Sequence, residues 1–165
     1  MKNKGLWIGI PVMVFFLGFA GIGSLYAQTD NRLNGRWVSI GYEVETEYIF
    51  NNGNFESTIN GVSMQKGTYT TNNSEIIIYE THFFGGFLDI LGVSGLESKW
   101  YSINEFIIAF RKILTEYGLS ENQINETVNQ MMAASPSTYT YSVDANILKL
   151  SSTGNNQVII FNKKK

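Results

Sequence analysis

The sequence predicts a mainly β domain in which about eight antiparallel strands follow one another, close into a barrel and are interrupted by two helices. Three observations lead to this prediction. Bulky and polar residues alternate with a period of two from residue 37 to 84, and again from 138 to 161. Turns rich in asparagine and glycine separate these segments. A helical stretch divides the strands into five before it and three after it.

The strands before the helical stretch are the clearest. Residues 43–50 alternate bulky residues with glutamates, and residues 55–60 repeat the pattern with Phe55 and Ser57 facing inward. Further strands are expected over 64–71, 75–84, 138–143, 147–151 and 157–161. Their links are short, so neighbours in sequence should be neighbours in space. Such a meander tends to close, because closure removes both exposed edges.

Residues 85–134 form the insertion between the fifth and sixth strands. Each predicted helix begins with a capping box, Ser102 with Glu105 and Ser120 with Gln123. The apolar stripe of the first helix comprises Ile103, Phe106, Ile107, Phe110, Ile113, Leu114 and Tyr117. These side chains must be buried in a stable monomer. We therefore expect the insertion to cap one end of the barrel, with Gly85-Gly86 as a hinge.

Residues 1–27 have the three parts of a secretory signal. Lys2 and Lys4 precede an uncharged run from 6 to 25, which ends near the small residue Ala27. Cleavage there would leave an exported, periplasmic or secreted domain of residues 28–165. The alternative is an uncleaved membrane anchor, because the run is roughly the ~20 residues that span a bilayer.

Composition narrows the classes of function. Residues 1–27 hold two of the 12 basic residues and none of the 14 acidic ones, so the remainder has a formal charge of −4. A mildly acidic domain lacks the basic surface expected of a nucleic-acid-binding protein. The chain has no cysteine, which excludes disulfides, thiol catalysis and a lipid-modified N-terminus. No cofactor is expected.

Three short segments resemble a known family. Gly35-Arg36-Trp37, just before the first strand, resembles the Gly-x-Trp signature of the lipocalin and wider calycin barrels. Residues 66–69 (Lys-Gly-Thr-Tyr) and 146–150 (Asn-Ile-Leu-Lys-Leu) are similar to bacterial lipocalin-like domains. The resemblance covers residues 33–84 and 137–162.

The resemblance implies a lipocalin-like barrel in which Trp37 closes one end beneath a basic side chain from the last strand. Lys163 is the candidate for that basic side chain. Two features depart from the family: its second signature, Thr-Asp-Tyr, is absent, and the helical insertion is not standard. A specific ligand cannot be carried over, since fold does not fix function.

Inward side chains of an eight-stranded barrel either fill it or line a cavity for one small ligand. The residues expected to line such a cavity are Trp37, Tyr48, Phe55, Tyr69, Phe84, Phe87, Leu91, Tyr139 and Tyr141. The predicted function is an exported, non-catalytic, lipocalin-like protein that binds a small apolar molecule in its barrel. The alternative is an interaction or inhibitor module that docks on a protein partner through residues 103–134, using Ile124, Val128 and Met131.

The sequence gives little indication of a catalytic or metal site. His82 is the single histidine and forms a Glu-x-His pair with Glu80, expected on one face of a strand. Two ligands fall short of the three or four that a metal ion needs. Glu43, Glu45 and Glu47 share one strand face and are expected to be solvated. No Gly-x-Ser-x-Gly motif is present, so neither an enzyme nor a metal site is expected.

We predict that the exported protein begins at or near Gln28, because the apolar run ends at Ala27 and polar residues follow. Intact mass spectrometry of the protein recovered from the periplasm or medium measures this directly. A full-length species held in the inner membrane would show that the segment is an anchor.

Overall fold

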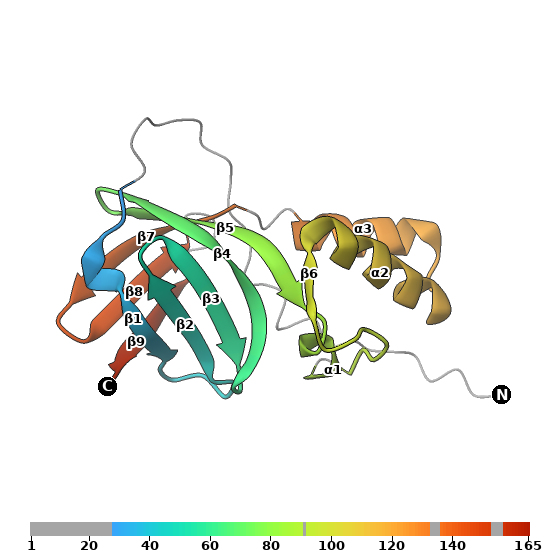
Figure 1. The fold of residues 1–165 in the computed structure, drawn as a ribbon, viewed down its shortest axis with the longest axis horizontal. Helices are drawn as coiled ribbons and strands as arrows, with labels where there is room; N and C mark the ends of the chain where they lie inside the picture. The colour runs from blue at the N-terminus through green and yellow to red at the C-terminus, as the bar shows by residue number, and fades with distance from the viewer. Residues whose placement is uncertain (1–27, 91, 133–135, 153–156) are drawn as a thin grey trace.

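The computed structural model describes residues 28–90, 92–132, 136–152 and 157–165, and it consists of a β-barrel with a helical lobe beside it (Figure 1). The strands are β1 (Gly35–Ser39), β2 (Thr46–Asn51), β3 (Asn54–Ile59), β4 (Val62–Asn72), β5 (Glu75–Phe84), β6 (Trp100–Ser102), β7 (Ser137–Asp144), β8 (Ile147–Ser152) and β9 (Val158–Lys164). The helices are η2 (Asn31–Leu33), α1 (Phe87–Ile90), α2 (Ile103–Glu116) and α3 (Glu121–Met132). The predicted signal, residues 1–27, lies outside the described residues.

Eight antiparallel strands close the barrel in the order β1-β2-β3-β4-β5-β7-β8-β9, with β9 returning to β1. The predicted mainly β barrel, with its helices between the fifth barrel strand and the next, is confirmed. The short strand β6 was not predicted, because three residues are too few for a periodic pattern. None of the helices in the described residues is long and apolar enough to span a membrane.

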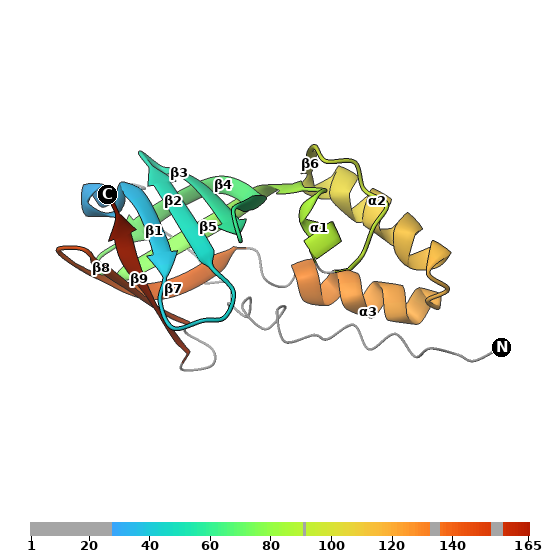
Figure 2. The ribbon, with the colours of Figure 1, turned by 90° about the horizontal axis from the view of Figure 1, so that it is seen from below.

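Strand β5 belongs to both parts of the molecule. It pairs with β4 along most of its length, while its other edge is divided between two strands. Residues 75–78 pair with β7 and close the barrel, and residues 82–84 pair with β6 in the lobe. The β4–β5 hairpin therefore carries the lobe, and Figure 2 shows it running from the barrel to the helices.

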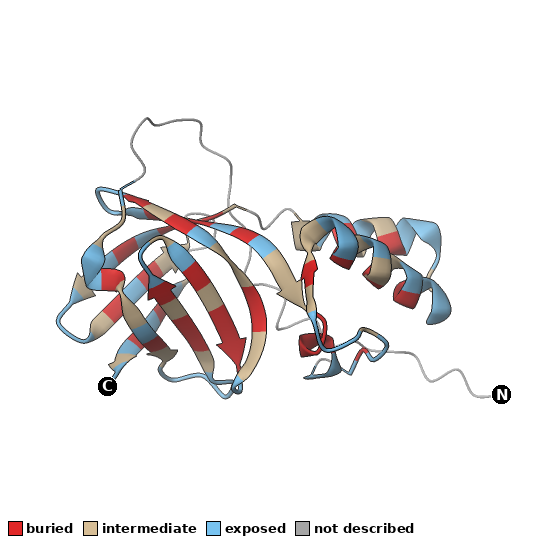
Figure 3. Ribbon diagram, viewed as in Figure 1, coloured by how far each residue is buried: buried red, intermediate tan, exposed pale blue. Residues whose placement is uncertain are grey.

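Alternating burial along the strands, visible in Figure 3, places one side chain in two inside the barrel. Aromatic rings fill much of this interior. The Tyr48 ring lies 5.2 Å from that of Phe55 and 4.9 Å from that of Phe161, and the Phe50 ring lies 4.9 Å from that of Tyr69. Such pairs add ~0.5–1.5 kcal/mol each to the stabilisation from apolar burial.

Trp37 and Lys163 close the end of the barrel next to η2. The Trp37 side chain is fully buried, and its Nε1 donates a 2.6 Å hydrogen bond to the Leu33 carbonyl. Lys163 Nζ lies over the indole, 5.0 Å from the ring centroid, which confirms the predicted partner. A Cβ on Gly35 would lie 2.8 Å from Lys163 Cε. The glycine of the Gly-x-Trp segment therefore leaves room for the lysine to cross the ring.

The lobe has an apolar cluster of its own. Both predicted capping contacts are present, Ser102 with Glu105 and Ser120 with Gln123. Four of the seven predicted stripe residues of α2 are buried in this cluster: Phe106, Phe110, Ile113 and Leu114.

This packing corrects the predicted cap. The barrel cluster contains no residue of 85–134, whereas the lobe cluster includes Ile59 and Met64 from the rim of the barrel. The lobe is attached at one end of the barrel, as expected, but it lies to the side of the barrel (Figures 1 and 2). The apolar stripe of α2 packs against residues of α1, β6 and α3, so its burial does not require the barrel interior.

The glycines predicted as a hinge have a packing role. Both are buried, and Gly85 N–H donates to the Lys99 carbonyl at 2.9 Å. A Cβ on Gly85 would lie 2.2 Å from the Glu97 carbonyl oxygen, and one on Gly86 would lie 2.8 Å from the Phe84 ring. Their lack of a side chain thus permits the close approach of β5 to the segment before β6.

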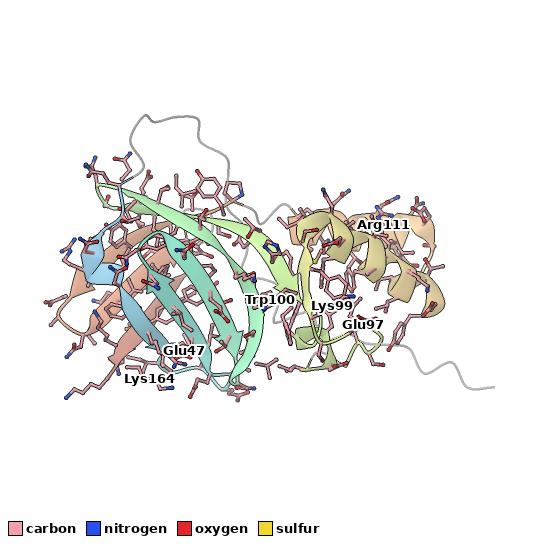
Figure 4. The ribbon with its side chains drawn as sticks, viewed as in Figure 1. Glu47, Glu97, Lys99, Trp100, Arg111 and Lys164 are labelled. Atoms are coloured by element: carbon pink, nitrogen blue, oxygen red, sulfur yellow. The ribbon has the colours of Figure 1, made fainter. Side chains whose placement is uncertain are left out.

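Glu47 was predicted to be solvated with Glu43 and Glu45, and this is wrong for Glu47. Its side chain is 5% exposed, and the Arg36 guanidinium binds both carboxylate oxygens at 2.9 and 2.6 Å. Lys164 Nζ lies 3.5 Å from the same carboxylate (Figure 4). The hydrogen bonds from Arg36 lower the pKa of Glu47. The pattern in residues 43–50 could not reveal partners supplied by the first and last strands.

Asp30 fixes the chain where it enters the barrel. Its carboxylate accepts hydrogen bonds from the Arg32 side chain at 2.6–3.0 Å and from the Tyr141 hydroxyl at 2.9 Å. The hydrogen bonds from the Arg32 side chain are the largest cause that lowers the pKa of Asp30 to about 2. Since Tyr141 belongs to β7, this contact joins the segment before β1 to a strand that is distant in the sequence.

We predict that Asp30→Asn lowers the free energy of unfolding at pH 7 by about 1 kcal/mol, a value reduced by solvent screening of the exposed Arg32. A carboxyl with a lowered pKa in the folded state stabilises the fold above its unfolded pKa, about 4. This stabilisation is lost as the pH falls from about 4 to about 2. Urea unfolding at pH 7, 4 and 2 should show the wild-type advantage disappearing. Glu43→Gln, at an exposed carboxylate, is the control, and an advantage that persists at pH 2 would contradict the assignment.

Candidate functional site

A row of polar side chains crosses the inner face of three neighbouring strands. Tyr48 on β2 pairs with Ser57 on β3, which pairs with Gln65 on β4. Their exposed fractions are 4%, 0% and 2%. Gln65 in turn pairs with Phe83, whose ring packs against the lobe cluster. The row therefore leads from the barrel interior toward the lobe.

Glu80 and Ser137 extend this polar region across β5 and β7. Ser137 lies opposite Ile78, on the inner face, and Glu80 follows two residues after Ile78. The Ser137 hydroxyl donates a 2.9 Å hydrogen bond to Glu80 Oε1, and the two residues are 3% and 5% exposed. A carboxylate so buried is costly unless hydrogen bonds or charges compensate it, so this position is chemically unusual for a barrel core.

Tyr139 and Tyr48 continue the hydrogen bonding from Ser137 into the barrel. Tyr139 makes side-chain hydrogen bonds with both Ser137 and Tyr48. Burial, and next the negative charge of Glu80, raise the pKa of Tyr139 to about 12. Burial likewise raises the pKa of Tyr48 well above its usual range. Both phenols therefore stay neutral at physiological pH and keep their O–H donors.

Ser57 completes the group, which we call the polar interior cluster: Tyr48, Ser57, Gln65, Glu80, Ser137 and Tyr139. Ser57 is fully buried, and its Oγ has no hydrogen-bond partner among the described residues. Leaving a buried hydroxyl unsatisfied costs about 1–3 kcal/mol. This hydroxyl is therefore an unsatisfied polar group in the barrel interior.

A β-bulge separates Glu80, which faces inward in register with Ile76 and Ile78, from His82, which faces outward. Gly67 pairs with Glu80, but Lys66 pairs with His82, so Thr81 is the extra residue on β5. A Cβ on Gly67 would lie 1.9 Å from the Tyr79 carbonyl oxygen, which explains the glycine there. The predicted Glu80–His82 pair on one strand face is therefore wrong, because the extra residue turns the two side chains to opposite faces.

The structure brings together six of the nine residues predicted to line a ligand cavity. Trp37, Tyr48, Phe55, Tyr69, Tyr139 and Tyr141 belong to the barrel cluster. Phe84 instead packs against Trp100, with ring centroids 5.4 Å apart, and Phe87 lies in the lobe cluster. These two placements are corrections: both residues follow the point where β5 leaves the barrel. Leu91 lies outside the described residues.

Four residues of the polar interior cluster were not predicted as site residues: Ser57, Gln65, Glu80 and Ser137. Ser57 was expected to face inward, but it was not among the residues expected to contact a ligand. Glu80 continues the period of two set by Ile76 and Ile78, which are fully buried. That continuation was the signal available in the sequence. It was missed because a charged residue is normally expected on the outer face of a strand.

The outer face of the same strands carries a shallow groove of about 390 Å³. Glu56, Lys66, Thr68 and His82 are among the side chains that line it. Lys66 Nζ lies 4.3 Å from the centroid of the Trp100 ring. This groove lies on the opposite side of the sheet from the polar interior cluster, so the two are separate.

The apolar stripe of α3, the proposed docking surface for a partner, is not available at the surface. Ile124 and Val128 are 2% and 4% exposed and belong to the lobe cluster, against which Met131 also packs. The stripe thus holds α3 within the lobe, and the reason for placing a protein partner there is lost.

Comparison with known proteins adds no identity: no family model, no curated protein and no solved structure matches this chain.

We predict that Gly67→Ala lowers the free energy of unfolding by about 2 kcal/mol or more, because the new methyl group overlaps the Tyr79 carbonyl at the bulge. Gly61→Ala is the matched control. Gly61 has a φ of +77°, but a Cβ added there would meet no atom within 4 Å, so its cost is the conformational one of ~1 kcal/mol. Denaturant unfolding of both variants measures the difference. Equal losses would contradict the role assigned to the Gly67 contact.

Proposed function

We propose that this chain is an exported, non-catalytic, lipocalin-like binding protein that holds a small molecule inside its barrel. The apolar part of the molecule lies among the aromatic rings, and its polar end meets Glu80 and Ser137. The observation that carries the proposal is the polar interior cluster, a buried hydrogen-bonded group within an otherwise apolar barrel.

The composition of the interior supports binding. Small-molecule sites are lined mainly by hydrophobic and aromatic side chains, with a few polar groups that fix the orientation of the ligand. The barrel has such a lining in Tyr48, Phe55 and Phe161, next to the carboxylate of Glu80. An apolar core of the same shape would avoid the cost of burying these polar groups, so their presence favours a role beyond stability.

The two ends of the barrel differ, which favours entry from one of them. Trp37, fully buried beneath Lys163, closes the end next to η2. The polar interior cluster leads toward the other end, where the lobe is attached. The Trp37–Lys163 arrangement also supports the lipocalin-like reading of the Gly35-x-Trp37 segment. The signal-like features of residues 1–27 support export.

We predict that the purified protein retains or takes up a small molecule in a 1:1 ratio. Native mass spectrometry before and after extraction with organic solvent, followed by titration with a panel of lipids and apolar dyes, measures this. Ser57→Leu places bulk within the polar interior cluster and should weaken binding by about tenfold or more, a loss of ~1.4 kcal/mol.

Ser142→Leu is the matched control for that variant. Ser142 lies on β7 with its side chain exposed on the outer face, so the same substitution there should leave binding unchanged. A protein that retains nothing and binds no member of the panel would contradict the proposed function. Equal weakening by both leucine variants would place the ligand outside the barrel.

A further inference from the structure

We infer that the molecule bound in the barrel is an organic amine in its protonated form, with Glu80 as the counter-charge. This inference rests on the proposed binding function and adds the chemical class of the ligand. Three features of the polar interior cluster support it: the sign of the buried charge, the surrounding aromatic rings and the hydroxyl of Ser57.

The buried charge that faces the interior is negative. The described residues include two buried glutamates, Glu47 and Glu80. Glu47 lies on the outer face, where Arg36 and Lys164 bind it. Glu80 faces inward, and its charge contributes to the raised pKa values of Tyr48 and Tyr139. An anionic ligand would be repelled there, whereas an ammonium group would be attracted.

Aromatic rings surround this part of the interior. Tyr48 lies at the centre, with ring centroids 5.2 Å from Phe55 and 4.9 Å from Phe161, and it is hydrogen-bonded to Tyr139. The face of an aromatic ring carries partial negative charge and attracts cations, most strongly where water is excluded. A buried carboxylate beside several rings therefore favours an ammonium group attached to an apolar body.

The Ser57 hydroxyl oxygen suits a primary ammonium, which has three N–H donors and no acceptor. Ser57 Oγ is fully buried without a hydrogen-bond partner among the described residues, so it can accept one of them. Ser57 and Glu80 lie on either side of β4, on the same inner face of the barrel. A carboxylate and a serine hydroxyl together suit a donor-only head group better than an alcohol.

The test compares three ligands of one size: octylamine, octan-1-ol and octanoate, titrated into the purified mature protein at pH 7 by calorimetry. The expected order is octylamine tightest, by about tenfold or more over octan-1-ol, with octanoate weakest. Glu80→Gln should bring the affinities of octylamine and octan-1-ol to within about threefold of each other, because octylamine loses more affinity than octan-1-ol. Circular dichroism establishes that the variant is folded.

The outcomes distinguish the proposed binding function from the inference that the ligand is an amine. Octan-1-ol or octanoate binding as tightly as octylamine would overturn the amine inference and leave the binding function standing. No binding of any of the three, nor of the wider panel, would overturn both. A preference for octylamine that survives Glu80→Gln would overturn the role of Glu80. Should that variant fail to fold, the wild-type order decides, together with Ser57→Ala, which should weaken octylamine more than octan-1-ol.

Discussion

The architecture depends on how strand β5 divides its hydrogen-bonding edges. A strand has two edges, and β4 occupies one of them along most of β5. The other edge closes the barrel over four residue pairs with β7 and then, after a short interval, pairs with β6 in the lobe. Closing the barrel removes its exposed edges, while the continuation of β5 gives the helices a rigid attachment. The barrel and the lobe can therefore keep separate apolar clusters, while β5 runs from one part to the other.

Local patterns predicted most of the barrel, because its strands are consecutive and alternate regularly. The inward positions of Tyr48, Phe55 and Tyr69 follow from a period of two, and the capping boxes follow from residues three apart. Predictions failed where the partner is distant in sequence. Glu47 is buried because Arg36 and Lys164 come from two other strands. Phe84 lies outside the barrel because this end of β5 pairs with β6 and no longer with β7. Strand β6 is separated from β5 in the sequence by a segment of the lobe.

The polar interior cluster shows how one extra residue changes the chemistry of a site. Without the bulge at Thr81, a period of two along β5 would place Glu80 and His82 on the same face. With it, Glu80 stays in register with Ile76 and Ile78, while His82 joins Lys66 on the outer groove. A bulge is set by close backbone contacts such as that of Gly67 with Tyr79. Such contacts leave no periodic trace in the sequence, which is why the alternation wrongly placed His82 on the same face as Glu80.

The two ends of the barrel interior differ in polarity. At the η2 end, Trp37 is buried with its single N–H satisfied by a backbone carbonyl, so that end needs no further partner. Toward the lobe, hydrogen bonding runs from Tyr48 through Tyr139 and Ser137 to Glu80. Because each hydroxyl orients the next, a charge placed near Glu80 affects all the hydrogen bonds of this series. A cationic head group would be attracted to Glu80 at the lobe end, whereas a neutral apolar end would not, so the arrangement favours one orientation of a ligand as well as one charge.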